Sequence, residues 1–115
     1  MSEILNNKEF TMVKGLDELF DNIIRAQEVI KLDLSKCELA SIPEEVFFFT
    51  NLRVLYLAKN KIRKIPNDIN VFQNLEVLDL SHNNLESFPE VLVELSSLQD
   101  LYLINNKITE IPDSI

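Results

Sequence analysis

The stretch "LRVLYLAKNKIRKIPNDINVFQN", from Leu52 to Asn74, decides the fold of this chain. Its opening part places leucine at alternate positions, Leu55 and Leu57, which is typical of a half-buried strand. Further on, Pro66 fixes the backbone angle φ at the start of a short helical turn, where its missing N–H costs little. The stretch therefore predicts a strand that is followed by a helical turn.

The same pattern recurs along most of the chain. Its prolines are each 23 residues apart, at Pro43, Pro66, Pro89 and Pro112. Alignment on the prolines gives three complete units and one incomplete unit: residues 29–51, 52–74, 75–97 and 98–115. Seven apolar positions in each complete unit, and six in the last, are filled without a polar exception. Because no unit can bury its own apolar side, the sequence predicts a solenoid of stacked units.

The ninth position of the unit carries a polar side chain of a particular kind. It is asparagine in three units (Asn60, Asn83 and Asn106) and Cys37 in the first. An amide both donates and accepts hydrogen bonds, so it can satisfy backbone groups where the chain turns inward. We expect these side chains to stack as a ladder along the solenoid.

These features together resemble the leucine-rich repeat family, in its 23-residue class with Ile-Pro after the strand. The resemblance covers Val29 to Ile115. It implies an α/β solenoid, a short horseshoe arc with a parallel β-sheet on its concave side. Such repeats are similar to those of short bacterial leucine-rich repeat proteins and of intracellular regulators of Ras-like signalling. The implied function is a protein–protein interaction module.

Residues 1–28 precede the first unit and contain an amphipathic pattern. Apolar residues follow a helical spacing, at Leu16, Leu19, Phe20, Ile23 and Ile24. We expect a helix that caps the open end of the first unit. The alternative, a helix on a membrane surface, is disfavoured by the acidic residues Asp17, Glu18 and Asp21 on its polar face.

A run of aromatic residues, "VFFF" from Val46 to Phe49, raises a question about burial. Phe49 falls on a core position, whereas Phe47 and Phe48 fall on positions that normally face outward. We expect both to pack against the capping helix or against the segment around Phe10 and Met12. An exposed patch for a partner is the alternative.

The charge of the chain limits its partners. Nineteen acidic and eleven basic side chains give a net charge of −8, which argues against binding nucleic acid or anionic membranes. The charge is uneven, however, since the window from Asn51 to Gln73 carries a net +4. Steering of an acidic partner therefore stays open.

Three sequence features concern the compartment. Cys37 is the one cysteine and cannot form an internal disulfide, which favours a reducing environment. The start of the sequence lacks a signal-peptide pattern, and no apolar run approaches the ~20 residues of a membrane span. We expect a cytoplasmic protein, with secretion as the alternative if a leader was removed, and no membrane span.

No pattern for catalysis, a metal ion or a cofactor is present. Cys37 and His82 stand at different repeat positions that face opposite sides of the wall. Asp33 and Asp79 flank Tyr56 on neighbouring strands, which puts them roughly 10 Å apart, at the upper limit for an inverting glycosidase. The face is also open to water. The sequence predicts a protein that is not an enzyme.

The predicted binding surface lies on the exposed side of the strands and the turns that follow them. Tyr56 and Tyr102 are expected anchors, because tyrosine offers a large contact area with a polar tip. Val54 and Val77 would make an apolar centre beside Tyr56, with charges around it. The candidate partner-binding residues are Lys31, Asp33, Val54, Tyr56, Lys59, Val77, Asp79, His82, Asp100, Tyr102 and Asn105.

The alternative function is self-association through the incomplete last unit. Its strand, residues 101–104, would be an unpaired edge of the kind that proteins usually protect. A two-fold homodimer would cover this edge and the apolar side chains beside it. The candidate residues are Leu101, Leu103, Ile108, Ile111 and Ile115.

Overall fold

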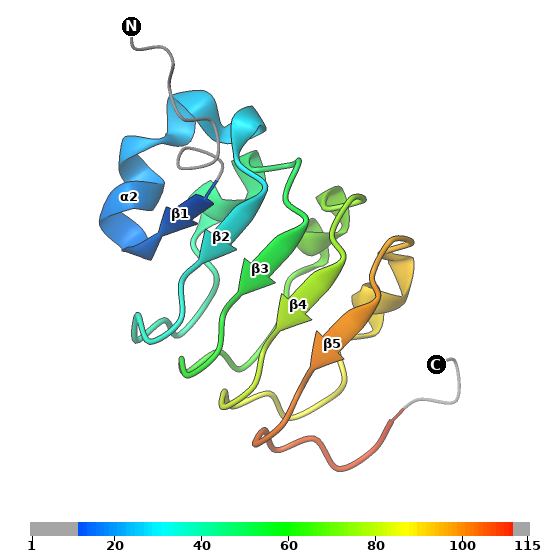
Figure 1. The fold of residues 1–115 in the computed structure, drawn as a ribbon. Helices are drawn as coiled ribbons and strands as arrows, with labels where there is room; N and C mark the ends of the chain where they lie inside the picture. The colour runs from blue at the N-terminus through cyan, green and yellow to red at the C-terminus, as the bar shows by residue number, and fades with distance from the viewer. Residues whose placement is uncertain (1–11, 112–115) are drawn as a thin grey trace, which may run out of the picture.

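Five short strands form one parallel sheet whose order follows the chain (Figure 1). The computed structural model describes residues 12–111. The strands are β1 (Met12–Lys14), β2 (Lys31–Asp33), β3 (Val54–Tyr56), β4 (Val77–Asp79) and β5 (Asp100–Tyr102). This sheet, with turns of helix behind it, confirms the predicted solenoid of leucine-rich repeat type.

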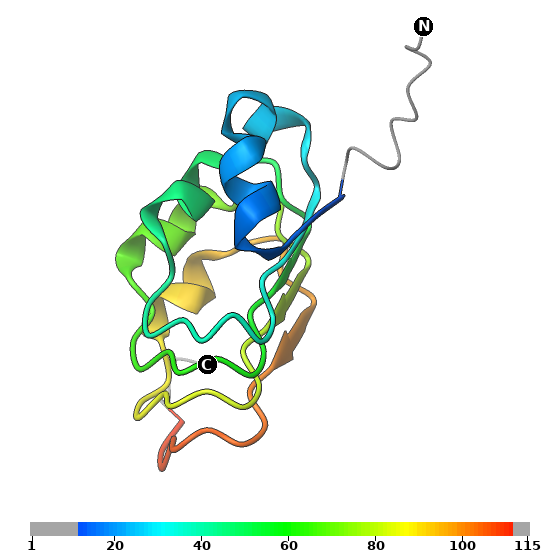
Figure 2. The same cartoon turned by 90° about the vertical axis from the view of Figure 1, so that its left-hand side faces the viewer.

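A layer of short helical turns lies on the side opposite the sheet (Figure 2). These turns are the 3-10 helices η3 (Glu44–Phe48), η4 (Asn67–Val71) and η5 (Glu90–Glu94). Pro43, Pro66 and Pro89 each occupy the N-cap position with an extended ψ, at the start of the helical turn as the sequence predicts. Proline suits this place because the backbone N–H that it lacks has no helical partner there.

The core lies between these two layers. All 21 apolar positions of the three complete units are buried, with an exposed fraction of 9% or less. Phe49 and Phe72 are the largest side chains among those that are fully buried. The repeat pattern therefore predicted the buried apolar positions of the three complete units.

The asparagine ladder is present and connects neighbouring units. The Asn60 side-chain oxygen accepts hydrogen bonds from the N–H groups of Cys37 and Leu39, at 2.9 and 3.0 Å. Its amide nitrogen donates to the carbonyls of Leu34 and Leu57, at 3.0 and 2.9 Å. One side chain thus satisfies backbone groups in two units, which is what the turn into the core requires.

Strand β1 was not predicted. It pairs with β2 in register, with Met12 beside Lys31 and Lys14 beside Asp33. Gly15 follows at φ 84°, a left-handed conformation that glycine adopts without steric cost, and turns the chain into helix α2 (Gly15–Asp21). Because strands are about 4.8 Å apart, the fifth strand widens the sheet from roughly 14 Å to roughly 19 Å.

The predicted capping helix is shorter than its amphipathic pattern suggests. Helix α2 ends at Asp21, and a 3-10 turn, η2 (Ile23–Glu28), replaces its continuation. Leu19 is fully buried, whereas Phe20 and Ile24 are 49% and 98% exposed. The prediction was wrong for these two residues. Ile24 lies beyond the end of the helix, in a 3-10 turn whose period differs from that of an α-helix.

The expectation for Phe48 was also wrong, and Phe47 has a neighbour that was not predicted. The Phe47 ring stacks on Phe72 of the next unit, with ring centroids 5.8 Å apart. Phe48 is 55% exposed. Phe10, the other expected neighbour, lies outside the described residues.

Candidate interaction surface

The exposed side of the sheet presents two columns of side chains, in the predicted register. The third-position column is Lys31, Val54, Val77 and Asp100, and the fifth-position column is Asp33, Tyr56, Asp79 and Tyr102. Strand β1 adds Met12 to the first column and Lys14 to the second. We call these ten residues the sheet face.

The centre of the sheet face is apolar. Val54, Val77 and Tyr56 are each partly buried by their neighbours. The Lys31 ammonium lies 5.2 Å from the centroid of the Tyr56 ring, within range of a cation–π attraction. The Lys31 side chain covers one surface of the Tyr56 ring and restricts its movement. Tyr102, on the outer strand, is 48% exposed, so it is held less firmly than Tyr56.

Charge is distributed unevenly across the sheet face. Lys14 and Lys31 lie on β1 and β2, and Asp79 and Asp100 lie on β4 and β5. Asp33, beside Lys14, is the exception on the first side. A partner that crosses the strands therefore meets mostly positive charge at one end and negative charge at the other, a polarity that sets the orientation of binding.

The two aspartates of the fifth column have a structural task. An oxygen of Asp33 accepts a hydrogen bond from the Ser35 N–H at 3.0 Å, and Asp79 does the same for Ser81 at 2.9 Å. Each carboxylate thus closes the turn at the end of its own strand. The two aspartates lie two strands apart with Tyr56 between them, as the sequence predicts.

The turn after each strand has a backbone feature that the sequence did not reveal. The eighth-position residues Lys36, Lys59, His82 and Asn105 all have positive φ, between 58° and 62°. The N–H groups of the first three bond across the stack, as when His82 donates to the Ile104 carbonyl at 2.7 Å. The side chains of His82 and Asn105 also meet, with Nδ1 and Nδ2 3.0 Å apart. Lys59, His82 and Asn105 therefore form one edge of the candidate surface.

Cys37 lies behind this edge in the first unit. Its Sγ is 3.5 Å from the Ser35 carbonyl oxygen, to which the thiol donates. Burial raises the pKa of the Cys37 thiol, and the nearby negative charge of Asp33 raises it further. The thiol therefore stays protonated at neutral pH, and its reactivity as a nucleophile is low.

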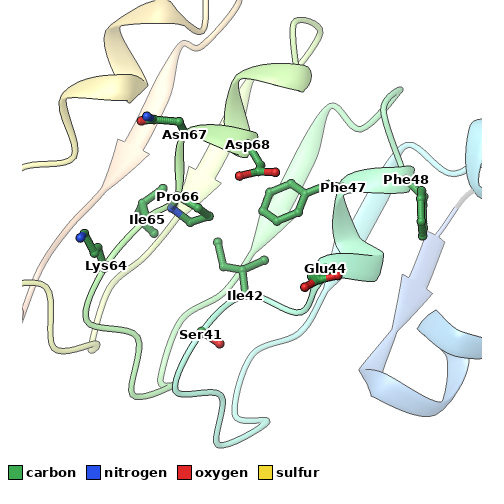
Figure 3. Close-up of a pocket in the computed structure, with 10 residues that line it drawn as sticks. All are labelled: Ser41, Ile42, Glu44, Phe47, Phe48, Lys64, Ile65, Pro66, Asn67 and Asp68. Atoms are coloured by element: carbon green, nitrogen blue, oxygen red, sulfur yellow. The ribbon is translucent and has the colours of Figure 1, made fainter.

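A groove of about 840 Å³ lies on the other side of the molecule, between η3 and η4 (Figure 3). Ile42, Phe47, Ile65 and Pro66 form its apolar part, with charged side chains around it. Figure 3 shows Phe47 and Asp68 facing one another across the groove. No sequence pattern predicted it, because it depends on how two neighbouring units are spaced.

Residues 12–111 contain neither a metal-binding cluster nor a helix of the membrane-spanning kind. No group of three or more histidine, cysteine, aspartate or glutamate side chains in this range could hold a metal ion. Among the described helices, none has both the length and the apolar character that a bilayer crossing requires.

The predicted self-association residues lie at the far end of the stack. Leu101, Leu103 and Ile108 are partly exposed, and Ile111 is 57% exposed. Their counterparts one unit earlier, Leu78, Leu80 and Leu85, are at most 1% exposed. Ile115 lies outside the described residues.

Comparisons with known proteins agree with the fold. The leucine-rich repeat family model matches residues 50–108. A leucine-rich repeat protein of Leptospira interrogans superposes with a TM-score of 0.74 and 29% identity, over 88% of this chain and 26% of that one. An internalin of Listeria monocytogenes superposes with a TM-score of 0.64 and 28% identity, over 74% of this chain and 25% of that one. A search of curated proteins found no match.

This chain spans about a quarter of the length of each of these two structures. The family model, by contrast, covers just over half of this chain, and its match falls on the units defined by the proline spacing. The chain belongs to the leucine-rich repeat family.

Proposed function

We propose that this chain is a non-enzymatic protein–protein interaction module that binds its partner through the sheet face and the adjoining turns. The observation that carries the proposal is the apolar centre of Val54, Val77 and Tyr56, surrounded by charge on one continuous sheet. Protein interfaces combine such a centre with a polar rim. Membership of a family of interaction modules supports the same function.

The absence of enzymatic activity is part of this proposal. It is supported by the use of Asp33 and Asp79 as hydrogen-bond acceptors for their own turns. It is also supported by the openness of the sheet face, which offers no enclosure that would exclude water from a reaction. A reducing compartment such as the cytoplasm fits the free thiol of Cys37.

The size of the sheet face bears on the affinity. A sheet roughly 19 Å wide with short strands offers less than the ~800 Å² that each partner buries in a standard interface. The proposal therefore includes the turns that carry Lys59, His82 and Asn105. A partner that contacts the sheet face alone would bind with modest affinity.

The test is an affinity measurement on a partner isolated by pull-down with this chain. Tyr56→Ala should weaken binding by about tenfold or more, and Tyr102→Ala by less, because Tyr102 is more exposed at the outer strand. The matched control is Val93→Ala, since Val93 is 52% exposed on η5, away from the sheet. Loss of binding in the Val93 variant with unchanged binding in both tyrosine variants would move the site to the helical side.

Self-association through the last unit is the second candidate. The partial exposure of Leu101, Leu103 and Ile108, against full burial of their counterparts, supports contact of this end with further protein. A two-fold dimer would pair the β5 edges and cover these side chains. Light scattering over a range of concentrations should then show a transition to twice the monomer mass. A constant monomer mass at high concentration would exclude this candidate.

A further inference from the structure

We propose that the turns of the first two complete units bind an extended acidic segment of a partner protein, with carboxylates at alternate residues. The inference rests on the interaction function proposed above and specifies the chemistry of the partner. It starts from a set of five basic side chains, which we call the basic row: Lys36, Lys59, Lys61, Arg63 and Lys64.

The loop of the second unit presents positive charge at every second residue. Asn60 and Ile62 point into the core and are 8% and 0% exposed. Lys59, Lys61 and Arg63, which alternate with them, are exposed. The backbone bends at Lys59 and Asn60, whereas an extended chain from Lys61 to Arg63 would advance about 3.3–3.6 Å per residue, so these two charges are roughly 7 Å apart. A second extended chain with acidic side chains at alternate residues has the same spacing.

The first unit adds a positive charge beside this loop. The Lys36 N–H donates to the Ala58 carbonyl at 3.0 Å, and the Lys59 N–H donates to the Ser81 carbonyl at 2.9 Å. The two lysines therefore occupy successive steps of the same stack, about one strand spacing apart. Like charges at this separation repel each other, and a carboxylate placed between them would remove the repulsion.

Neighbouring acidic residues leave most of this charge unpaired. Between described residues, Arg63 is the member of the basic row that makes an ion pair, with Glu86 at 3.7 Å, and both side chains are mostly exposed. Glu38 lies in the adjacent turn and forms no ion pair with the row within residues 12–111. Five of the eleven basic side chains of a chain with net charge −8 are thus concentrated here.

The backbone gives an independent reason to connect the two lysines with binding. Lys36 and Lys59 have φ values of 59° and 62°, a left-handed conformation that is unfavourable for a side chain of this kind. The same position in the last unit is Asn105, a residue type that tolerates this conformation well. Lysine is therefore not the side chain that the turn itself favours, although the backbone N–H bonds of Lys36 and Lys59 to the next unit stabilise the turn.

The surroundings favour a short acidic segment over a longer polyanion. A nucleic acid or an anionic lipid surface would extend past the basic row, and the net charge of −8 on the chain would repel the part that does so. The row also continues into the sheet face, because Lys59 follows β3 and Lys31 covers Tyr56 on the same side of the sheet. A segment held by the row can thus extend its apolar residues onto Val54 and Tyr56.

The experiment measures fluorescence anisotropy of labelled peptides with the full chain at about 50 mM salt, where exposed charges are weakly screened. The probes are a peptide in which glutamate and serine alternate, a peptide of the same composition with all glutamates contiguous, and an oligothymidylate of equal charge. The alternating peptide should bind more tightly than both other probes. Its binding should weaken steeply as salt is raised.

The variants take their substitutions from other units of the same chain. Asn105 and Asn84 are the counterparts of Lys59 and Lys61, so Lys59→Asn with Lys61→Asn removes two charges while the turn is retained. This double variant should bind the alternating peptide about fivefold more weakly, since each exposed ion pair is worth a factor of about two to three. Lys107→Asn is the matched control, at the position of Lys61 in the last unit, and should change binding less than about twofold.

Three results would overturn the proposal: no binding of the alternating peptide, equal binding of all three probes, or equal loss in the double variant and the Lys107 control. The Tyr56→Ala variant distinguishes peptide binding at the basic row from partner binding at the sheet face. Peptide binding that depends on Lys59 and Lys61 but not on Tyr56 supports the acidic segment even if the sheet-face test on the isolated partner fails. If peptide binding depends on Tyr56 but not on Lys59 or Lys61, the acidic-segment proposal is wrong, whereas the sheet-face proposal is still supported.

Discussion

At the scale of the residue, the eighth position of each unit has the sharpest conflict between side chain and backbone. Four different residues share one left-handed conformation there, and two of them are lysines. A β-carbon in this conformation crowds the carbonyl that follows, which costs roughly 1–2 kcal/mol. The turn is retained because the N–H of each of the first three residues bonds to a carbonyl of the next unit.

We expect Lys59→Asn to increase stability by about 0.5–1 kcal/mol, because asparagine adopts positive φ more readily and the repulsion with Lys36 is removed. Urea denaturation monitored by circular dichroism measures this gain. Lys107 is not among the residues with positive φ, so Lys107→Asn should leave stability within about 0.5 kcal/mol. A loss of stability in the Lys59 variant would show that lysine makes a compensating contact in solution.

At the scale of the element, the asparagine ladder determines whether a turn can enter the core. The Asn83 oxygen accepts a hydrogen bond from the Ile62 N–H at 2.9 Å. Its amide nitrogen donates to the carbonyls of Leu57, Leu80 and Ser81, at 2.9, 3.0 and 3.3 Å. Asn83 is 5% exposed, so water cannot replace these bonds without opening the turn.

Asn83→Ala should therefore destabilise the chain by about 3 kcal/mol or more, since several buried backbone groups lose their partner at once. The midpoint of urea denaturation reports this loss. Asn74→Ala is the control, because Asn74 is exposed and should change stability by less than about 0.5 kcal/mol. Similar midpoints for the two variants would mean that the ladder is not what stabilises the turn.

At the scale of the whole molecule, stability is distributed along the stack. Each unit contacts mainly its neighbours, so a unit with a neighbour on each side buries its leucines fully. Leu78 in β4 is fully buried, whereas Leu101 in β5 is only partly buried. The same leucine at the same repeat position thus contributes differently according to its place in the stack.

We expect Leu78→Ala to cost about 3–4 kcal/mol and Leu101→Ala only about 1–2 kcal/mol, because less apolar surface is buried around Leu101. Both values come from urea denaturation at low protein concentration. If the two costs are equal, or if the cost at Leu101 rises with protein concentration, Leu101 is covered in solution by further protein.

The candidate site was predictable to the extent that it repeats. The two columns of the sheet face follow from the 23-residue period, because residues at equal repeat positions must lie beside each other once the leucines are stacked. Lys59, His82 and Asn105 were placed on the same edge for this reason. The left-handed backbone of this position was not predictable from Lys36 and Lys59, since lysine carries no signal for it.

The sequence by itself determined the solenoid, the parallel register and the buried set, because apolar side chains at a fixed period can be covered only by stacking. The tertiary structure alone decided the features that lack a repeat: strand β1, the exposure of Phe20 and Ile24, and the stacking of Phe47 on Phe72. Strand β1 lies outside the 23-residue repeat, so no periodic pattern marks it, and it is formed by its pairing with β2. Such features depend on contacts between distant segments, and a local pattern of residues does not record them.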